Sequence, residues 1–279
     1  MTRTHLPLIL LISPILAACG PRTAIAPTHA PAWTSTLTAT VLPTETEPAT
    51  PTPLPSPSLY PLPALEATLG PCDERRPADL FAEVTASFGI SPDYVPPDLV
   101  RLGGYVSGYV ALPDLMLRQE AARALGSMVK AMKAAGLAPT VLSAYRSYTD
   151  QYLSYQRWLA ADPENASQVS QQPGHSEHQL GTVVDFGSPE LAALTGDPAE
   201  KFSPLFAQTS EGGWLAEHAH EYGFTLTNPL GAERLTGLTY EPWHYRYVGP
   251  ELAAYLHESG YFLTEYLFQV RPGVPCTSD

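Results

Sequence analysis

The stretch that decides the fold is residues 174–186, which read GHSEHQLGTVVDF. Its last four residues have the apolar, β-branched composition of a short strand. Successive side chains of a strand point to opposite faces, so Val184 and Phe186 would share one face and Asp185 would lie on the other. A carboxylate in an apolar strand is costly to bury unless a positive group meets it. His178 lies one loop upstream and is placed to reach the same point.

A second cluster lies at residues 240–249, which read YEPWHYRYVG. Glu241 and His244 are held close together there, because the proline between them restricts the backbone. Two neutral imidazoles and one carboxylate form a zinc-binding set with a fourth position left open. A nearby carboxylate that does not bind the metal can act as a general base. His178, Asp185 and His244 fit the first role, and Glu241 fits the second.

Spacing alone leaves this interpretation open. A lone histidine is more often a satisfied surface or core residue than a metal ligand, and the sequence does not show that the two clusters meet in space. The chain also lacks the His-Glu-x-x-His motif that would strengthen the case.

The pattern around both clusters predicts an α+β fold. Apolar spacing and turn residues predict helices and short strands in alternation. Because the later strands follow one another through tight turns, we expect a small, mainly antiparallel sheet flanked by helices, with the zinc site at the sheet. This domain is expected to occupy residues 71–279. The expected helices are 113–135, one from 147 or 149 to 162, 214–222 and 250–259, and the expected strands are 140–143, 182–186, 224–227 and 243–248.

The first 70 residues predict where in the cell the protein resides. Residues 1–18 have the weakly basic start, apolar run and small residues of a secretory signal peptide. Residues 16–20, LAACG, resemble the bacterial lipobox, which implies cleavage before Cys19, lipidation of that cysteine and an extracytoplasmic domain anchored to the membrane. A plain signal peptide with an incidental cysteine is the alternative. Residues 19–70 are rich in Pro, Thr, Ala and Ser, which predicts a disordered tether.

Two further cysteines, Cys72 and Cys276, flank the domain. Outside the cytoplasm two leftover thiols usually pair. A bridge between them would close a loop of about 200 residues, which stabilises a fold by on the order of 5 kcal/mol. Two unpaired cysteines are the alternative.

The formal charge of −13 limits the class of partner. It argues against a nucleic-acid binder, which needs a basic face to meet phosphate. It also argues against a protein that holds an anionic polymer by charge alone.

Both clusters resemble those of the VanY-type D-alanyl-D-alanine carboxypeptidases. That family has a Ser-x-His-x-x-Gly-x-x-x-Asp segment, here residues 176–185, and then Glu-Pro-Trp-His-Tyr-Arg-Tyr-Val-Gly, here residues 241–249 without a change. Residues 143–148, SAYRSY, followed by Gln151, resemble its Ser-Gly-Tyr-Arg-Ser-x-x-x-Gln segment. The resemblance covers roughly residues 98–269.

The resemblance implies a role for each residue. Glu241 would be the general base of the reaction. Arg146 would touch either the C-terminal carboxylate of the substrate or the oxyanion, since a guanidinium suits both. Ser176 and Gln151 would contact the substrate. The residues implied to bind Zn²⁺ are His178, Asp185 and His244.

The implied activity is a metallo-carboxypeptidase that removes the terminal D-alanine from peptidoglycan stem peptides, and we expect it to be a monomer. An L,D-carboxypeptidase acting on tetrapeptide stems would use the same metal and base. A non-catalytic wall-binding module would be expected to lack one of them. Residues 227–228 are Thr-Asn where the family often has Arg-Tyr, and this departure bears on the choice of peptide more than on the metal.

Three other histidines and an arginine are conspicuous. His175 is a candidate ligand three residues before His178, but the family usually has another residue there. His218 and His220 lie on an expected helix and fit surface or packing roles. Arg246 fits a structural ion pair as well as it fits the site.

Overall fold

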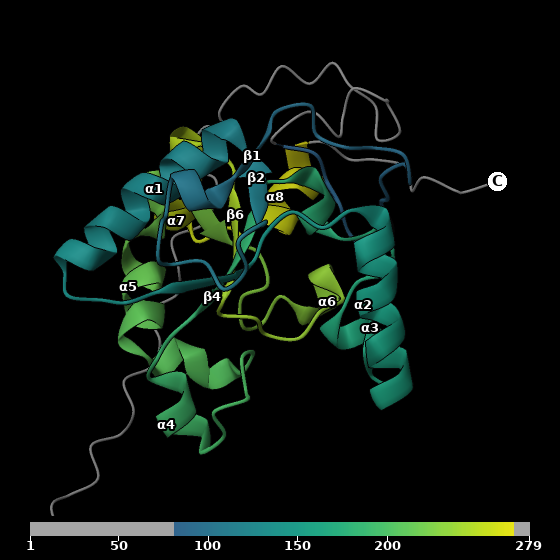
Figure 1. Cartoon of the computed structure of the whole chain (residues 1–279). Helices are drawn as coiled ribbons and strands as arrows, with labels where there is room; N and C mark the ends of the chain where they lie inside the picture. Colours follow the sequence, from purple (N-terminus) through teal and green to yellow (C-terminus); the bar gives the residue numbers. More distant parts are fainter. Residues whose placement is uncertain (1–80, 271–279) are drawn as a thin grey trace, which may run out of the picture. The chain divides into compact units, whose positions relative to one another are not determined.

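The protein is described by a computed structural model that places residues 81–270 (Figure 1). The predictions for Cys19, for the 19–70 tether and for a Cys72–Cys276 bridge lie outside the described residues. Among residues 81–270, none of the helices combines the length and the apolar character that crossing a bilayer requires.

A four-stranded antiparallel sheet forms the centre of the described part, in the order β3-β4-β6-β5. This confirms the predicted fold class. In β4 and β6 the register pairs Asp185 with His244 directly across the two strands. The bounds of the strands are Thr140–Ser143 (β3), Val183–Gly187 (β4), Phe224–Leu226 (β5) and His244–Tyr247 (β6).

The two faces of the sheet differ as period-two alternation predicts. Val184 and Phe186 belong to the main hydrophobic core, together with residues of α1 (Gln119–Ala134) and α5 (Ser210–His218). Asp185, His244 and Arg246 occupy the alternate positions of β4 and β6 and are buried on the other side. Figure 1 shows α1 and α5 on one side of the strands and α2 (Tyr148–Ala161) on the other. The polar face of the sheet therefore looks toward α2.

Two helices begin at other residues than predicted. The helix expected from residue 113 begins at Gln119, because Met116–Arg118 forms a strand, β2, that pairs with β1 (Leu99–Arg101). Leu117 continues the helical spacing of α1 and yet lies in this strand, so periodicity alone could not separate the two. The helix expected at 214–222 is α5 from Ser210 followed by a 3₁₀ turn, η6 (Ala219–Tyr222). The helix expected from residue 147 or 149 is α2, which begins at Tyr148 and opens with a capping box between Ser147 and Asp150.

Several short elements were not predicted, and one of them carries a site residue. The 3₁₀ turn η4 (Glu177–Leu180) holds His178. The closing helix α7 (Pro250–Ser259) was predicted and is followed by one that was not, α8 (Leu263–Val270). The remaining short helices are η3 (Leu102–Gly104), α3 (Ala166–Val169), α4 (Leu191–Thr195), η5 (Pro204–Gln208) and α6 (Glu233–Thr236).

Candidate metal centre and active site

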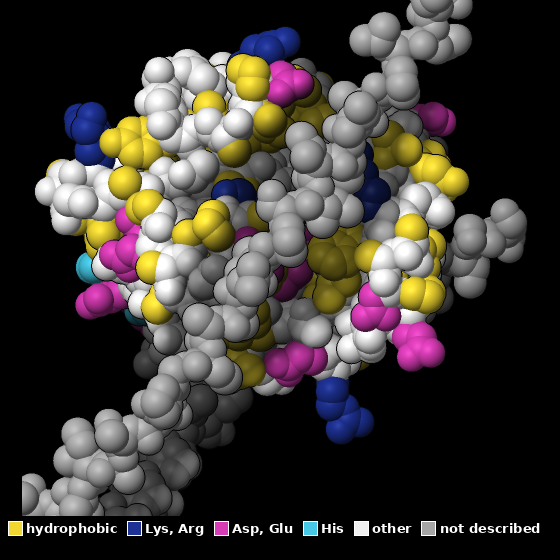
Figure 2. Space-filling view, turned by 60° about the horizontal axis from the view of Figure 1, so that its bottom comes forward, with side chains coloured by type: hydrophobic (Ala, Val, Ile, Leu, Met, Phe, Trp, Pro, Cys, Tyr) yellow, Lys and Arg dark blue, Asp and Glu magenta, His cyan; other side chains and the backbone are white. Residues whose placement is uncertain are grey.

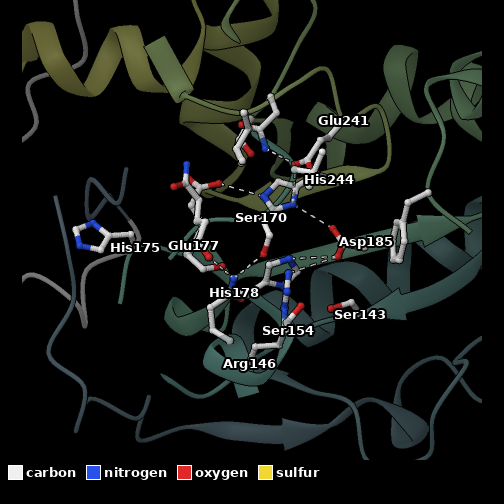
Figure 3. A pocket seen from close by; sticks show the side chains of 18 of the residues that line it. Ser143, Arg146, Ser154, Ser170, His175, Glu177, His178, Asp185, Glu241 and His244 are labelled. Carbon is white, nitrogen blue, oxygen red and sulfur yellow. Dashed lines mark hydrogen bonds and ion pairs between the residues drawn. The ribbon is translucent and has the colours of Figure 1, made fainter. Parts of the chain in front are cut away.

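The structure brings the three predicted metal ligands together from three elements (Figure 3). His178 comes from η4, Asp185 from β4 and His244 from β6. One ligand atom from each lies within 4.8 Å of the other two, and all three residues are buried. Asp185 lies between the imidazoles, with 3.2 Å from Oδ2 to His178 Nε2 and 3.0 Å from Oδ1 to His244 Nδ1.

The surroundings of His178 leave one nitrogen for a metal. Its Nδ1 lies 2.6 Å from the backbone oxygen of Ala144. A carbonyl can only accept, so Nδ1 carries the hydrogen and Nε2 offers its lone pair. Within residues 81–270 the buried Nε2 makes no hydrogen bond of good geometry. A divalent cation in contact with Nε2 and Asp185 would satisfy it, and the His-Asp-His donor set is one that suits zinc.

The other imidazole, that of His244, contacts a carboxylate on each side. Asp185 lies at Nδ1, and Glu177 Oε2 lies 3.2 Å from Nε2. The second oxygen of Glu177 accepts a 2.7 Å hydrogen bond from Arg246, whose side chain is fully buried. Burial opposes ionisation of Glu177, but the charge of Arg246 and the hydrogen bond with His244 outweigh it and lower its pKa to about 2. Glu177 is therefore ionised at neutral pH.

Glu177 was not predicted as a site residue. Two features of the sequence are consistent with its place at the site but do not show its contact with His244: it directly precedes His178, and Arg246 is two residues after His244, on the same face of β6. The direction of the Glu177 side chain depends on the 3₁₀ turn η4, which the sequence did not predict.

The predicted general base, Glu241, lies beside the ligands without joining them. Its Oε2 is 3.8 Å from His244 Nδ1 and accepts a 2.6 Å hydrogen bond from Asn228 Nδ2. Burial raises the pKa of Glu241 to about 7, and Asp185 adds to this effect, whereas His244 and Asn228 oppose it. A carboxyl with such a pKa can both take up and release a proton near neutral pH. Asn228, which with Thr227 departs from the family pattern, thus contacts the predicted base itself.

Arg146 also lies next to Asp185. Its backbone N–H donates to the backbone oxygen of His178 at 3.3 Å, and its guanidinium lies 3.9 Å from Asp185 Oδ2. Burial lowers the pKa of Arg146, although Asp185 and Glu241 counteract this. The guanidinium is therefore a partly desolvated positive charge next to the ligand set, where an anionic group of a substrate would meet it.

The two imidazoles differ in charge. Burial lowers the pKa of His178 to about 4, and Arg146 acts in the same direction. Burial also disfavours the charged form of His244, but its hydrogen bonds with Asp185 and Glu177 outweigh burial and raise its pKa to about 10. Burial would raise the pKa of Asp185, yet the two imidazoles hold it well below its usual range. A bound divalent cation would take the place of the proton that His244 shares with Asp185.

The two residues predicted to contact substrate lie at the site, and their roles remain predictions. Ser176 is buried and lines the cavity described below. Gln151 is also buried, and its Nε2 donates to Ser170 Oγ at 3.2 Å and to the backbone oxygen of Gln171 at 2.6 Å. Its amide therefore holds the 170–171 segment against α2.

The other conspicuous histidines lie outside the ligand group. His175 bonds the backbone oxygen of Thr85 through Nδ1 at 2.9 Å and points away from the ligands in Figure 3. His218 pairs with Glu221, and His220 stacks on His257 with a ring separation of 3.6 Å.

A cavity of about 460 Å³ opens at the ligand group, a volume typical of ligand pockets, which are roughly 300–1,000 Å³. One wall is formed by the side chains of α2 that face the cavity, including Ser154 and Trp158. The other includes Phe202 and Trp243, whose rings lie 5.6 Å apart. Figure 2 looks onto this face, and acidic side chains lie deep in its central recess beside hydrophobic ones. The cavity thus joins a charged floor to partly aromatic walls.

Comparison with known proteins agrees with this geometry. The sequence profile of the VanY family, described as D-alanyl-D-alanine carboxypeptidase, matches residues 114–250. A protein of Bacillus subtilis (strain 168) named as a candidate carboxypeptidase, YodJ, is 31% identical over 198 residues, which cover 71% of this chain and 70% of that relative.

Two solved structures are similar over most of their length. The LdcB LD-carboxypeptidase has a TM-score of 0.59 and 30% identity, and the match covers 68% of this chain and 86% of that chain. A variant of the vancomycin-resistance D,D-pentapeptidase VanY, crystallised with Zn(II), has a TM-score of 0.53 and 27% identity over 67% of this chain and 98% of that chain. The chain therefore belongs to the VanY family of D-alanyl-D-alanine carboxypeptidases.

Proposed function

We propose that the chain is a zinc-dependent carboxypeptidase that removes the terminal D-alanine from peptidoglycan stem peptides. The observation that carries the proposal is the meeting of His178, Asp185 and His244 beside an uncoordinated carboxylate, Glu241. The family and the Zn(II)-containing relative support the same activity and the same metal.

The chain's residues divide the work of peptide hydrolysis. His178, Asp185 and His244 would hold zinc, which when bound polarises the scissile carbonyl and lowers the pKa of water. Glu241 accepts a proton from the attacking water and returns it to the amine of the departing D-alanine. The Arg146 guanidinium stabilises negative charge on the substrate at the cavity floor.

An L,D-carboxypeptidase is the second candidate, and a specific observation favours it. The LdcB LD-carboxypeptidase has the same fold at 30% identity. The two activities require the same metal and base and differ in the configuration of the residue before the scissile bond. The cavity walls, including the unusual Thr227-Asn228 pair, are therefore where the choice between them is made.

A digest of defined stem peptides tests the proposal. Purified protein is incubated with tripeptide, tetrapeptide and pentapeptide stems, with and without a chelator, and the products are weighed by mass spectrometry. We expect loss of one alanine from the pentapeptide, abolished by the chelator and restored by zinc. Loss of alanine from the tetrapeptide alone would assign the L,D-activity.

The variant Glu241→Ala separates the base from the metal. We expect it to bind zinc and to lose activity by at least the roughly 10²–10⁴-fold that general-base catalysis contributes. An exposed carboxylate, Glu190, provides the matched control, and Glu190→Gln should hydrolyse the pentapeptide like the parent. Full turnover by Glu241→Ala, or digestion that survives complete metal removal, would contradict the proposal.

We also propose that the domain works outside the cytoplasm, held to the membrane by lipid on Cys19. Support comes from the lipobox-like residues 16–20 and the signal-like residues before them. Stem peptides lie on that side of the membrane, so the proposed location and the proposed substrate agree.

A further inference from the structure

We propose that Glu177 is a positioning residue of the metal centre, which fixes the tautomer and the ring orientation of His244 and is itself held by Arg246. The inference rests on the proposed function only through the metal, since it concerns how the centre binds zinc and not which peptide is cut.

The contacts give each oxygen of Glu177 one partner. Oε1 accepts from Arg246 at 2.7 Å, and Oε2 lies 3.2 Å from His244 Nε2. The same guanidinium donates to the backbone oxygen of Ala82 at 2.7 Å. Arg246 therefore joins Glu177 to the 81–90 segment, which contributes Val84 and Thr85 to the cavity wall.

Burial makes this arrangement rigid. The side chain of Glu177 is 15% exposed, that of His244 is 7% exposed and that of Arg246 is fully buried. A buried ion pair that loses one partner leaves an uncompensated charge, so neither Glu177 nor Arg246 can turn away without a large cost. The carboxylate consequently keeps its direction toward the imidazole.

The direction of this hydrogen bond decides which nitrogen can bind zinc. An ionised carboxylate only accepts, so Nε2 keeps its hydrogen toward Glu177, and Nδ1, which faces Asp185, is the nitrogen whose proton zinc would displace. His178 has the opposite arrangement, with the hydrogen on Nδ1 and the lone pair on Nε2, because its acceptor is the carbonyl of Ala144. The two imidazoles thus present different nitrogens to one point, and each needs its own acceptor.

Zinc affinity of the full chain tests the role. Carboxylates that orient a ligating histidine typically contribute roughly 10–100-fold to metal affinity. We expect Glu177→Ala to raise the Kd for zinc by about that factor, and Glu177→Gln to raise it less, because its amide oxygen can still accept. The matched control is Glu190→Gln, which removes an exposed carboxylate outside the ligand group and the cavity lining and should leave the Kd unchanged. Kd is measured by competition with a chromophoric chelator, and circular dichroism of each variant checks the fold.

Cobalt substitution adds a readout that simple destabilisation would not change. The visible bands of bound Co²⁺ report ligand geometry, so we expect them to shift in Glu177→Ala and to recover in Glu177→Gln. A zinc Kd and a cobalt spectrum identical to those of the parent would overturn the proposal.

A measurement on the parent protein needs no variant and applies if Glu177→Ala fails to fold. Nitrogen-15 NMR of the zinc-loaded chain identifies the protonated nitrogen of each imidazole. We expect hydrogen on Nε2 of His244 and on Nδ1 of His178, and hydrogen on Nδ1 of His244 would overturn the proposal. Failure of the stem-peptide digest would leave these zinc measurements standing, and their failure would leave the digest standing.

Discussion

At the scale of single residues, the unusual position of the chain is Asn228. Its amide donates a hydrogen bond to the Glu241 carboxylate, which also lies 3.8 Å from Nδ1 of His244, one of the predicted metal ligands. The bond stabilises the ionised form of Glu241, against the burial that favours the neutral form. The departure from the family pattern therefore lowers the pKa of the proposed base, and we expect its effect in the pH dependence of the reaction.

Replacing Asn228 with alanine should raise the pH below which activity is lost. The general base must be ionised, so activity is present above the pKa of Glu241 and is lost as the pH falls through it. Loss of the hydrogen bond raises that pKa by about one to two units, because a bond to a charged group contributes about 1.5–3 kcal/mol and one unit corresponds to about 1.4 kcal/mol. The measurement is kcat/KM for the pentapeptide as a function of pH.

The control for this shift is Asn165→Ala. Asn165 is exposed and donates to Asp162 at 2.8 Å, so its removal should leave the acid limb where it is. If Asn228→Ala also leaves the limb in place, the limb belongs to a group other than Glu241.

At the scale of elements, the strands that bear ligands were predictable and the turns were not. Val183 to Phe186 and the 243–248 segment have the alternation of half-polar strands, and β4 and β6 follow it. Elements of three to five residues, such as β1, α3 and η4, are too short to show a period. Glu177 lies in one of these, so its contact with His244 could be found only in the folded chain.

The junction of η6 and β5 gives a prediction about stability. Gly223 has φ of 81°, and a Cβ there would lie 2.7 Å from Tyr247 Cε2 and 3.0 Å from the backbone carbon of Gly249. Gly223→Ala should therefore destabilise the domain in two ways, by about 1–2 kcal/mol for the left-handed backbone and by about 1–3 kcal/mol for the overpacking. Urea denaturation measures the loss.

Gly196 separates the two contributions. It has φ of 73° at the end of α4, and nothing lies within 4 Å of a Cβ built there. Gly196→Ala should thus show the backbone cost alone and lose less free energy of unfolding than Gly223→Ala. Equal losses of unfolding free energy in the two variants would show that Tyr247 and the 249–250 backbone shift to make room for the added methyl group.

At the scale of the whole molecule, the ligands come from segments that meet only when the sheet is formed. His178 and His244 are far apart in sequence, and their rings lie 5.1 Å apart in the fold. Hydrophobic alternation could predict the face on which each side chain lies, but the pairing of β4 with β6 depends on packing between distant residues. Family resemblance, and not periodicity, supplied the expectation that the two clusters meet at one metal, and the strand pairing itself was not predicted.

The location of the molecule is testable through its cysteines. In a bacterial host the full chain should be cleaved before Cys19, gain the mass of lipid and sediment with membranes. Cys19→Ser should lack the lipid and leave the membrane fraction, because acyl chains are what hold such a protein there. Cys72→Ser is the control and should stay with the membranes. Membrane retention of Cys19→Ser at the parent level would refute the lipid anchor.

The cross-strand pairing of Asp185 with His244 has a practical consequence. Paired residues on neighbouring antiparallel strands are separated by a distance of about 4.5–5.5 Å that the backbone ladder sets. The loop at 196–203, which brings Phe202 to the cavity wall, does not enter into that distance. Variants of this loop can therefore be screened for new peptide selectivity while the geometry of the metal site stays the same in every variant.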